Sequence, residues 1–140
     1  MKLLIVEDQE DPLEVLVSTV NNIIPSHYPD FSEDDYDVAR CYADAQSRIS
    51  EDDYQIILLD NRMPYENQGD LETTDFNRFC SYLENIGYNL IPVIKEKNPE
   101  TIIIGTSSLS KSELRGLPAP DYTMSKTWGK AETDLQQILR

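Results

Sequence analysis

One stretch, Tyr54 to Pro64 (YQIILLDNRMP), limits most strongly how this chain can fold. Its apolar run, Ile56 to Leu59, contains two β-branched isoleucines and is bounded by polar residues, which is typical of a central strand buried on both faces. Pro64 can continue neither a helix nor a ladder, so we expect a turn there. Asp60 then lies at the carboxyl end of a buried strand, where open α/β sheets place their ligand sites. Taken alone, such an aspartate is more often an ordinary strand-ending or helix-capping residue, so the other segments must decide.

The chain is strongly acidic, with 26 Asp and Glu against 12 Lys and Arg and a formal net charge of −14. Acidic runs such as Glu33–Asp35 and Glu51–Asp53 are typical of solvated turns. Because there is no basic stripe, we expect no direct binding to nucleic acid or to an anionic membrane. There is no secretory signal and no apolar stretch of bilayer length. Cys41 and Cys80 are too few for a disulfide scaffold and lack metal-ligand spacing, so we expect a reduced, cytoplasmic setting.

Strand-like and helix-like segments alternate along the 140 residues, which predicts a single domain, 1–140. Asp11 is the expected N-cap of the first helix, with Pro12 at its first position and Glu14 completing a capping box; Pro25 is its expected end. The alternation indicates an α/β fold: a doubly wound, five-stranded parallel sheet with helices on both faces. We expect strands at 2–6, 36–41, 54–59, 101–106 and 121–125, and helices over 12–24, 42–49, 76–86, 90–97 and 131–139.

Polar residues of complementary chemistry stand at the strand exits: Glu7 and Asp8, then Asp60, then Thr106, then Lys126. The carboxyl ends of parallel strands share one edge, so these residues can converge in one shallow site. Three carboxylates held close would raise one another's pKa unless a cation lies among them. The candidates are the ammonium of Lys126 and a divalent ion, and Mg²⁺ suits best because it binds through a few carboxylates and keeps exchangeable waters.

A carboxylate beside Mg²⁺ and a lysine can attack a phosphoryl group and form an aspartyl phosphate. Such transfer depends on positioning and charge neutralisation, and a hydroxyl such as that of Thr106 can bond the new phosphoryl oxygens. Each residue also has an ordinary interpretation: Glu7 and Asp8 as a turn, Thr106 as a helix cap and Lys126 as a surface lysine. Their joint placement at the strand exits favours the phosphoryl site.

With these residues in view, the sequence resembles the receiver domain of two-component response regulators. The resemblance spans nearly the whole chain, in the order LLIVED (Glu7, Asp8), IILLDNRMP (Asp60), IIIGTSS (Thr106) and DYTMSK (Lys126). It implies a flavodoxin-like fold with strand order 2-1-3-4-5. It also implies a signalling domain, not an enzyme with a separate substrate, which catalyses only its own phosphorylation and dephosphorylation.

The resemblance implies a role for each site residue and a set of partners. Phosphate comes from a sensor histidine kinase or a phosphotransfer protein, and the signal passes to a downstream effector protein by contact. His27, the only histidine, is expected in a proline-flanked loop and is not expected to carry phosphate. The implied roles are phosphoacceptor for Asp60, side-chain Mg²⁺ ligands for Asp8 and Asp60, holder of a metal-bound water for Glu7, a backbone carbonyl ligand for Arg62, switch hydroxyl for Thr106 and phosphate-pairing lysine for Lys126.

Two features depart from the family pattern. Asp60 and Thr106 are 46 positions apart, against about 30 residues for an ordinary βαβ unit. The excess forms an inserted helical segment at about 65–88, which is either an extra helix packed on the domain or a partner or homodimer surface. Second, threonine instead of proline follows Lys126, and Tyr122 stands one position before the family's switch aromatic, so Tyr122 could take that role only with a bulge.

Three functions stay open on the sequence. Only 14 residues follow Lys126, so we expect a stand-alone phosphorylatable receiver without an output domain. The irregular segment from Ser110 to Lys126 favours instead a phosphate-independent pseudo-receiver that acts only as an interaction module. A haloacid-dehalogenase-type phosphatase would also use an Asp nucleophile and Mg²⁺, but Arg62 occupies the position where that family has a second aspartate.

Overall fold

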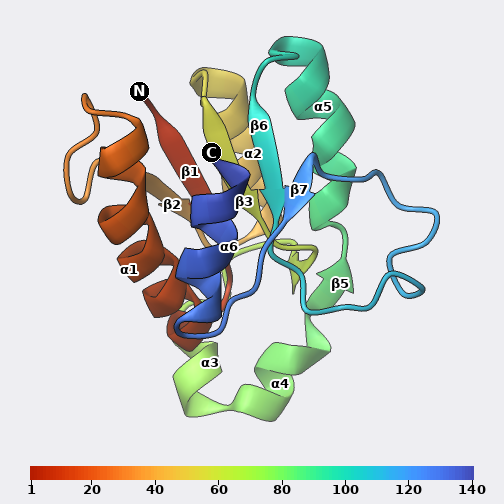
Figure 1. Ribbon diagram of the computed structural model, residues 1–140. Coiled ribbons are helices and arrows are strands. Elements are labelled where there is room, and N and C mark those ends of the chain that lie inside the picture. Colours follow the sequence, from red (N-terminus) through yellow and green to blue (C-terminus); the bar gives the residue numbers. More distant parts are fainter.

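The computed structural model describes residues 1–140 and is built around a five-stranded sheet (Figure 1). The strand order is β2-β1-β3-β6-β7, and every neighbouring pair is parallel. The predicted doubly wound sheet of order 2-1-3-4-5 is therefore confirmed. The strands are β1 (Leu3–Val6), β2 (Asp37–Ala39), β3 (Ile56–Leu59), β6 (Ile102–Gly105) and β7 (Tyr122–Thr123).

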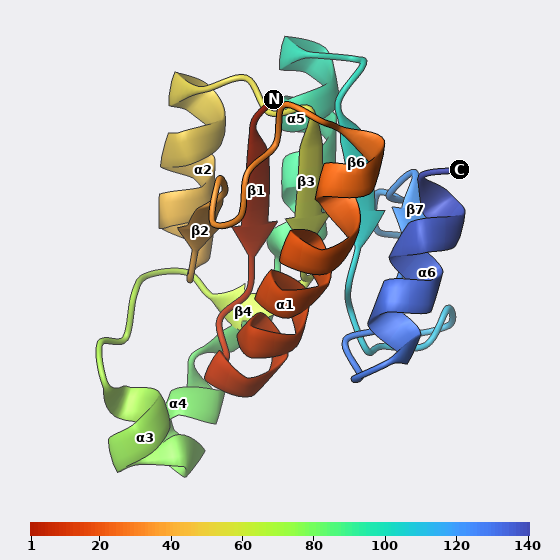
Figure 2. The same cartoon turned by 60° about the vertical axis from the view of Figure 1, so that its left-hand side comes forward.

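Helices cover both faces of this sheet, which explains why its central strands are apolar throughout (Figures 1 and 2). Alternate residues of a strand point to opposite faces. Leu3 and Ile5 accordingly belong to the core under α1 and α6, whereas Leu4 and Val6 belong to the core under α2 and α5. All residues of β1 and β3 are buried as a result. The helices are α1 (Glu10–His27), α2 (Tyr42–Glu51), α5 (Leu90–Lys97) and α6 (Lys130–Ile138).

Helix α1 begins before the predicted capping box. Gln9, not Asp11, occupies the N-cap position, and its side chain makes no capping hydrogen bond. Pro12 falls in the first turn, where backbone N–H groups have no acceptor within the helix, so its missing donor costs little. The exposed N–H of Glu10 donates instead to the carboxylate of Glu72, at 3.1 and 3.3 Å. A distant residue thus supplies the cap that the sequence placed locally.

The end of α1 also differs from the prediction. Pro25 lies inside the helix, and His27 is its last residue, not part of a loop. A proline this close to the end removes a single backbone hydrogen bond, and the burial of Ile24 in the core holds the final turn in place.

The connection between β3 and α5 contains a second, two-stranded sheet. β4 (Arg62–Pro64) pairs antiparallel with β5 (Leu83–Asn85). Two short helices, α3 (Leu71–Thr74) and α4 (Phe76–Ser81), join these strands and extend below the carboxyl edge of the main sheet (Figures 1 and 2). A 3₁₀ turn, η1 (Gly87–Asn89), then leads into α5.

Two predictions for this connection are wrong. The helix predicted over 76–86 ends at Ser81, because residues 83–85 pair with β4 instead of continuing the helix. Pro64 ends no ladder: it pairs with Leu83 in a two-stranded edge sheet, where a missing N–H is tolerated. Phe79 is buried, whereas Phe76 on the same helix is half exposed.

The connection between β6 and β7 forms turns and no regular helix, in agreement with the irregular segment expected from Ser110 onward. None of the helices combines the length and the apolar character that crossing a bilayer requires.

Candidate functional site

The strand exits form a continuous row at the carboxyl edge of the sheet. Backbone hydrogen bonding continues past the last strand residues, with the Asp60 N–H donating to the Val6 carbonyl (3.2 Å) and the Thr106 N–H donating to the Leu59 carbonyl (2.9 Å). Asp60 therefore lies directly between the first residues after β1 and the first residue after β6. The sequence predicted that these residues lie together, because the carboxyl ends of parallel strands share one edge of the sheet.

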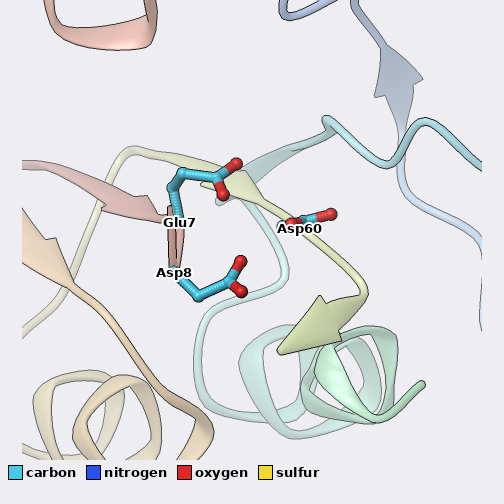
Figure 3. A group of neighbouring side chains, drawn as sticks. All are labelled: Glu7, Asp8 and Asp60. Atoms are coloured by element: carbon cyan, nitrogen blue, oxygen red, sulfur yellow. The ribbon is translucent and has the colours of Figure 1, made fainter. Parts of the chain in front are cut away.

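Three carboxylates gather at this edge. One oxygen from each of Glu7, Asp8 and Asp60 lies within 4.8 Å of the others, and all three residues are buried. Figure 3 shows Glu7 and Asp8 leaving the end of β1 and extending toward the side on which Asp60 lies. Two of the three side chains have hydrogen bonds: the Gln9 N–H donates to Glu7 Oε2 at 3.1 Å, and the Asn61 N–H donates to Asp60 Oδ1 at 2.8 Å. Neither oxygen of Asp8 has a partner.

Lys126 brings the one ammonium group into this cluster. Its Nζ lies 2.8 Å from Glu7 Oε1 and 3.2 Å from Asp60 Oδ2. Burial opposes the charge of the ammonium, but the charges of Asp60 and Glu7 outweigh it and raise the pKa of Lys126. The lysine therefore places a positive charge directly beside Asp60 and Glu7.

One ammonium does not neutralise three carboxylates, and the pKa values reflect the surplus of negative charge. Burial, followed by the charge of Glu7, raises the pKa of Asp8 to about 8. The same two causes raise the pKa of Asp60 to about 6, with Lys126 acting in the opposite direction. Asp60 is thus ionised at neutral pH, whereas Asp8 holds a proton for much of the time unless a further cation displaces it.

The residues at this edge fit a hard divalent cation. The donors are all carboxylate oxygens, the ligands that Mg²⁺ prefers, and the unpartnered oxygens of Asp8 are buried without compensation, which is costly for a polar group. Arg62, the remaining predicted ligand, lies in β4 with an exposed side chain. The expected ligand is its backbone carbonyl, and this part of the site stays a prediction.

Thr106 lies beside the cluster with an unused hydroxyl. The residue is buried, and its Oγ1 has no hydrogen-bond partner. It adjoins Asp60 across the β3–β6 pair, since Leu59 and Gly105 are directly opposite each other. A group with oxygen acceptors placed on Asp60 would supply what this hydroxyl lacks.

Sequence reasoning missed two residues that hold the site together. The carbonyl of Asn61 accepts from the N–H groups of Ile86 (3.1 Å) and Gly87 (2.8 Å), and its Oδ1 accepts from the Tyr88 N–H (3.0 Å). Asn61 thereby fixes the loop that follows Asp60 to residues far along the chain. Only its position directly after Asp60 could have drawn attention to it.

A second missed contact involves Arg40 at the end of β2. Its guanidinium donates to the Asp8 carbonyl (3.1 Å) and pairs with Glu10 (3.1 Å) and Glu72 (3.4 Å). Arg40 therefore links the acidic loop after β1 to helix α3. Neither the spacing nor the type of these residues indicates the contact in the sequence.

The segment around Lys126 was expected to depart from the family pattern, and its backbone is regular. All peptide bonds are trans, that of Lys126–Thr127 included. Tyr122 and Thr123 pair with Ile104 and Gly105 in regular register, without the bulge that Tyr122 would need to take the switch position. Tyr122 is instead half exposed.

No protein-family model matches this sequence, and no curated protein matches it. Solved structures do. A response regulator receiver protein from Sinorhizobium medicae aligns with a TM-score of 0.65 at 17% identity, over 99% of this chain and 94% of that one. The response regulator TrrA from Thermotoga maritima, in complex with Mg²⁺ and BeF, gives 0.64 at 17% identity, over 99% and 98%. The BeF3-activated DrrB receiver domain gives 0.62 at 17% identity, over 99% and 92%.

These likenesses extend over nearly the whole chain, and at such identities they concern the path of the backbone. Together with the strand order and the parallel pairing, they lead to one conclusion. The chain has the flavodoxin-like fold of response regulator receiver domains.

Proposed function

We propose that this protein is a response-regulator receiver that accepts a phosphoryl group on Asp60 in a Mg²⁺-dependent reaction and signals by protein–protein contact. One observation carries the proposal. Asp60 is buried between the ammonium of Lys126, 3.2 Å away, and an acidic pair whose Asp8 oxygens have no partner. The fold supports it, since receiver domains of the same fold include one in complex with Mg²⁺ and BeF.

The chemistry assigned to Asp60 is a nucleophilic displacement at phosphorus. A carboxylate oxygen of Asp60 forms a bond to the phosphorus of the donor, and the bond from phosphorus to the donor's leaving group breaks, with its electron pair going to that group. With a phosphohistidine donor the leaving group is the imidazole, and with acetyl phosphate it is acetate. Lys126 neutralises charge beside the transferred group, and the Thr106 hydroxyl donates to one of its oxygens.

The acidic cluster would hold the ion that this reaction needs. Asp8 and Asp60 would be its side-chain ligands, and Glu7 would hold a water of its coordination shell. Bound Mg²⁺ supplies positive charge to the phosphoryl oxygens. The protein's own contribution is to keep three carboxylates and one ammonium in place before the donor arrives, so that little reorganisation accompanies the transfer.

The partners follow from the proposed chemistry. We assign the donor to a sensor histidine kinase or a phosphotransfer protein and the output to a downstream effector protein. The domain catalyses its own phosphorylation and dephosphorylation and has no other substrate. Cys41 and Cys80 are free thiols, which suits the cytoplasm.

The test is phosphorylation by a small donor. The protein is incubated with acetyl phosphate and MgCl₂, and its intact mass is measured. We expect one phosphoryl adduct that hydroxylamine removes, as it removes acyl phosphates, and that does not form when EDTA is present. Asp60→Asn abolishes the adduct because an amide is no nucleophile. Asp53→Asn, at an exposed acid outside the site, is the matched control and should behave like the wild type.

Other outcomes would decide among the remaining functions. A wild type that neither forms an adduct nor binds Mg²⁺ would contradict the proposal and favour the phosphate-independent interaction module. Rapid turnover of small phosphate esters, without an adduct that persists, would favour a phosphatase.

A further inference from the structure

Lys126 is carried by the short loop that joins β7 to α6 (Figure 1). Met124, at the start of this loop, is buried, and its N–H donates to the Gly105 carbonyl at 2.9 Å. After Lys126, residues 127–129 are exposed, so burial of apolar side chains does not hold them. The position of the Lys126 backbone therefore depends on hydrogen bonds.

Asp134 of α6 supplies the one side chain outside the loop that hydrogen-bonds to the backbone of residues 125–127. The N–H of Ser125, directly before Lys126, donates to Asp134 Oδ2 at 2.8 Å. Within the loop, the Thr127 N–H donates to Ser125 Oγ at 3.1 Å, and the hydroxyl oxygens of these two residues lie 2.8 Å apart. By holding Ser125, Asp134 thus holds the residues on both sides of the lysine.

Helix α6 gives Asp134 a fixed place. Ala131 and Leu135 are fully buried in the core, and Asn22 of α1 donates to Glu132 at 2.8 Å. Asp134 precedes Leu135, and its side chain is only 18% exposed. The carboxylate therefore belongs to a helix that packing and a hydrogen bond to α1 keep in position.

The ordinary interpretation of Asp134 is a surface ion pair within the helix. Its carboxylate lies 2.9 Å from the ammonium of Lys130, four residues before it. The side chain of Lys130 is 66% exposed, however, and exposed pairs of this kind contribute little to stability. The hydrogen bond to Ser125 is the less exposed of the two contacts, and it is the one that reaches the loop.

The place of the lysine backbone matters because the ammonium makes two close contacts. Nζ lies 2.8 Å from Glu7 and 3.2 Å from Asp60, at the end of a long, flexible side chain. A shift of the backbone carries the ammonium away from at least one of these carboxylates. A misplacement of about 1 Å at a reacting group can slow a reaction about 100-fold.

We propose that Asp134 is a positioning residue for phosphoryl transfer, whose carboxylate holds the backbone at Ser125 so that Lys126 stays beside Asp60. The inference rests on the proposed function. Asp134 hydrogen-bonds to neither Asp60 nor Glu7, so it acts through Lys126. Its contact with Ser125 needs an acceptor oxygen and no charge, which means that the amide oxygen of an asparagine can replace it.

The first experiment measures how fast the phosphoryl adduct forms with acetyl phosphate and MgCl₂, by intact mass. Asp134→Ala should slow the reaction roughly 10- to 100-fold, as expected for a misplaced Lys126. Asp134→Asn should keep nearly the wild-type rate, because its amide oxygen still accepts from the Ser125 N–H. Lys130→Met removes only the surface pair of Asp134, so it is the matched control and should behave like the wild type.

A double-mutant cycle separates this role from a merely structural one. Asp134→Ala is introduced into the wild type and into Lys126→Met, and all four proteins are unfolded in urea without Mg²⁺ or phosphate. In the wild type, loss of the Ser125 hydrogen bond should raise the unfolding equilibrium constant roughly 2- to 10-fold. In Lys126→Met the rise should be at least about twofold smaller, because the ion pairs that the bond keeps in place are already lost.

Other results would overturn the inference in distinguishable ways. If Asp134→Ala forms the adduct at the wild-type rate, or if the two substitutions are additive in the cycle, Asp134 does not act through Lys126, and the proposed function stands without it. Equal losses in Asp134→Ala and Asp134→Asn also contradict the inference, since the charge of Asp134 would then matter and not its hydrogen bond. A wild type that takes no phosphoryl group contradicts both proposals.

Discussion

Two long connections leave the carboxyl edge of the sheet, one after β3 and one after β6, and they differ in how firmly hydrogen bonds hold them to the rest of the domain. Residues 61–89, after β3, are closed on themselves by the hydrogen bonds at Asn61 and by the β4–β5 pair. They are also bound to the rest of the domain, because the Ala43 N–H donates to the Tyr65 carbonyl (2.9 Å) and Glu72 contacts both Glu10 and Arg40. Residues 107–117, after β6, which we call the exit segment, make hydrogen bonds only with one another, such as that from the Leu114 N–H to the Ser110 carbonyl (3.1 Å).

This difference indicates where a signal from Asp60 can be expressed. Residues 61–89, which we call the frame, are held by several long-range hydrogen bonds. Moving the frame would break these bonds together, so we expect it to stay in place. A segment with only local bonds opens at low free-energy cost. We therefore expect phosphorylation to leave residues 61–89 in place and to shift residues 107–117, and the predictions below test that contrast.

The largest expected effect separates two glycines, one in each connection. Gly87→Ala places a methyl group against the backbone of Asp60 and should destabilise the protein by roughly 3 kcal/mol. Gly116→Ala meets no atom, but its φ of +86° is unfavourable for alanine, so the cost should be about 1 to 2 kcal/mol. Urea unfolding of both variants measures the difference. Equal costs would mean that residues 61–89 are no more rigid than the exit segment.

Mg²⁺ should lower the hydrogen exchange of the residues around Asp60 and leave that of the exit segment unchanged. At 100 times its Kd, the ion should stabilise the protein by about 2.7 kcal/mol, seen as a higher Tm. Protection from exchange should rise at residues 7–10, 59–62 and 86–88. Asp8→Asn should lose this response and Asp53→Asn should keep it. If Mg²⁺ instead protected residues 107–117 as strongly, the ion alone would drive the change that we assign to phosphate.

How much of this contrast the sequence could predict depends on the range of the contacts involved. The apolar runs of β1, β3 and β6 are local patterns, and a parallel sheet fixes where their exits lie, so Asp60, Thr106 and Lys126 could be brought together in advance. The segment from Ser110 onward was also predicted as irregular, and it forms turns without a regular helix.

The structure of residues 61–89 could not be predicted from the sequence, because contacts between distant residues determine it. Asn61 binds Tyr88 at a separation of 27 residues, and Glu72 caps α1 at a separation of 62. The apolar stripe predicted a helix over 76–86, but the helix ends at Ser81 because residues 83–85 take their backbone partners from β4. Local sequence patterns cannot predict contacts between residues that lie so far apart in the chain.

The cluster of Glu7, Asp8 and Asp60 should make the stability of the metal-free protein depend on pH. The folded pKa of Asp8, about 8, lies above its unfolded value, about 3.9, so the folded state binds more protons between these limits. The stability that the bound proton contributes is complete below about pH 4 and is lost as the pH rises to about 8. We expect a loss on the order of 2 kcal/mol, since three carboxylates share the proton. Thermal unfolding in EDTA measures it, and Asp8→Asn should flatten the profile. A profile that rises with pH and is unaffected by this substitution would contradict the raised pKa.

The smallest expected effect concerns Glu72, which binds residues 61–89 to the start of α1. Glu72 places its carboxylate at the first N–H of α1, 3.1 Å away, and pairs with Arg40. A carboxylate at a helix N-terminus contributes on the order of 1 kcal/mol, so Glu72→Ala should lower the free energy of unfolding by about that much. Deuterium uptake should rise over residues 69–75 and at the start of α1, while residues 107–117 keep their wild-type uptake. Glu66→Ala, at an exposed glutamate of the same connection that makes no side-chain hydrogen bond or ion pair, is the control and should change neither quantity. If loss of the Glu72 contact also loosened the exit segment, the two connections would form one unit, and phosphorylation would have to move both.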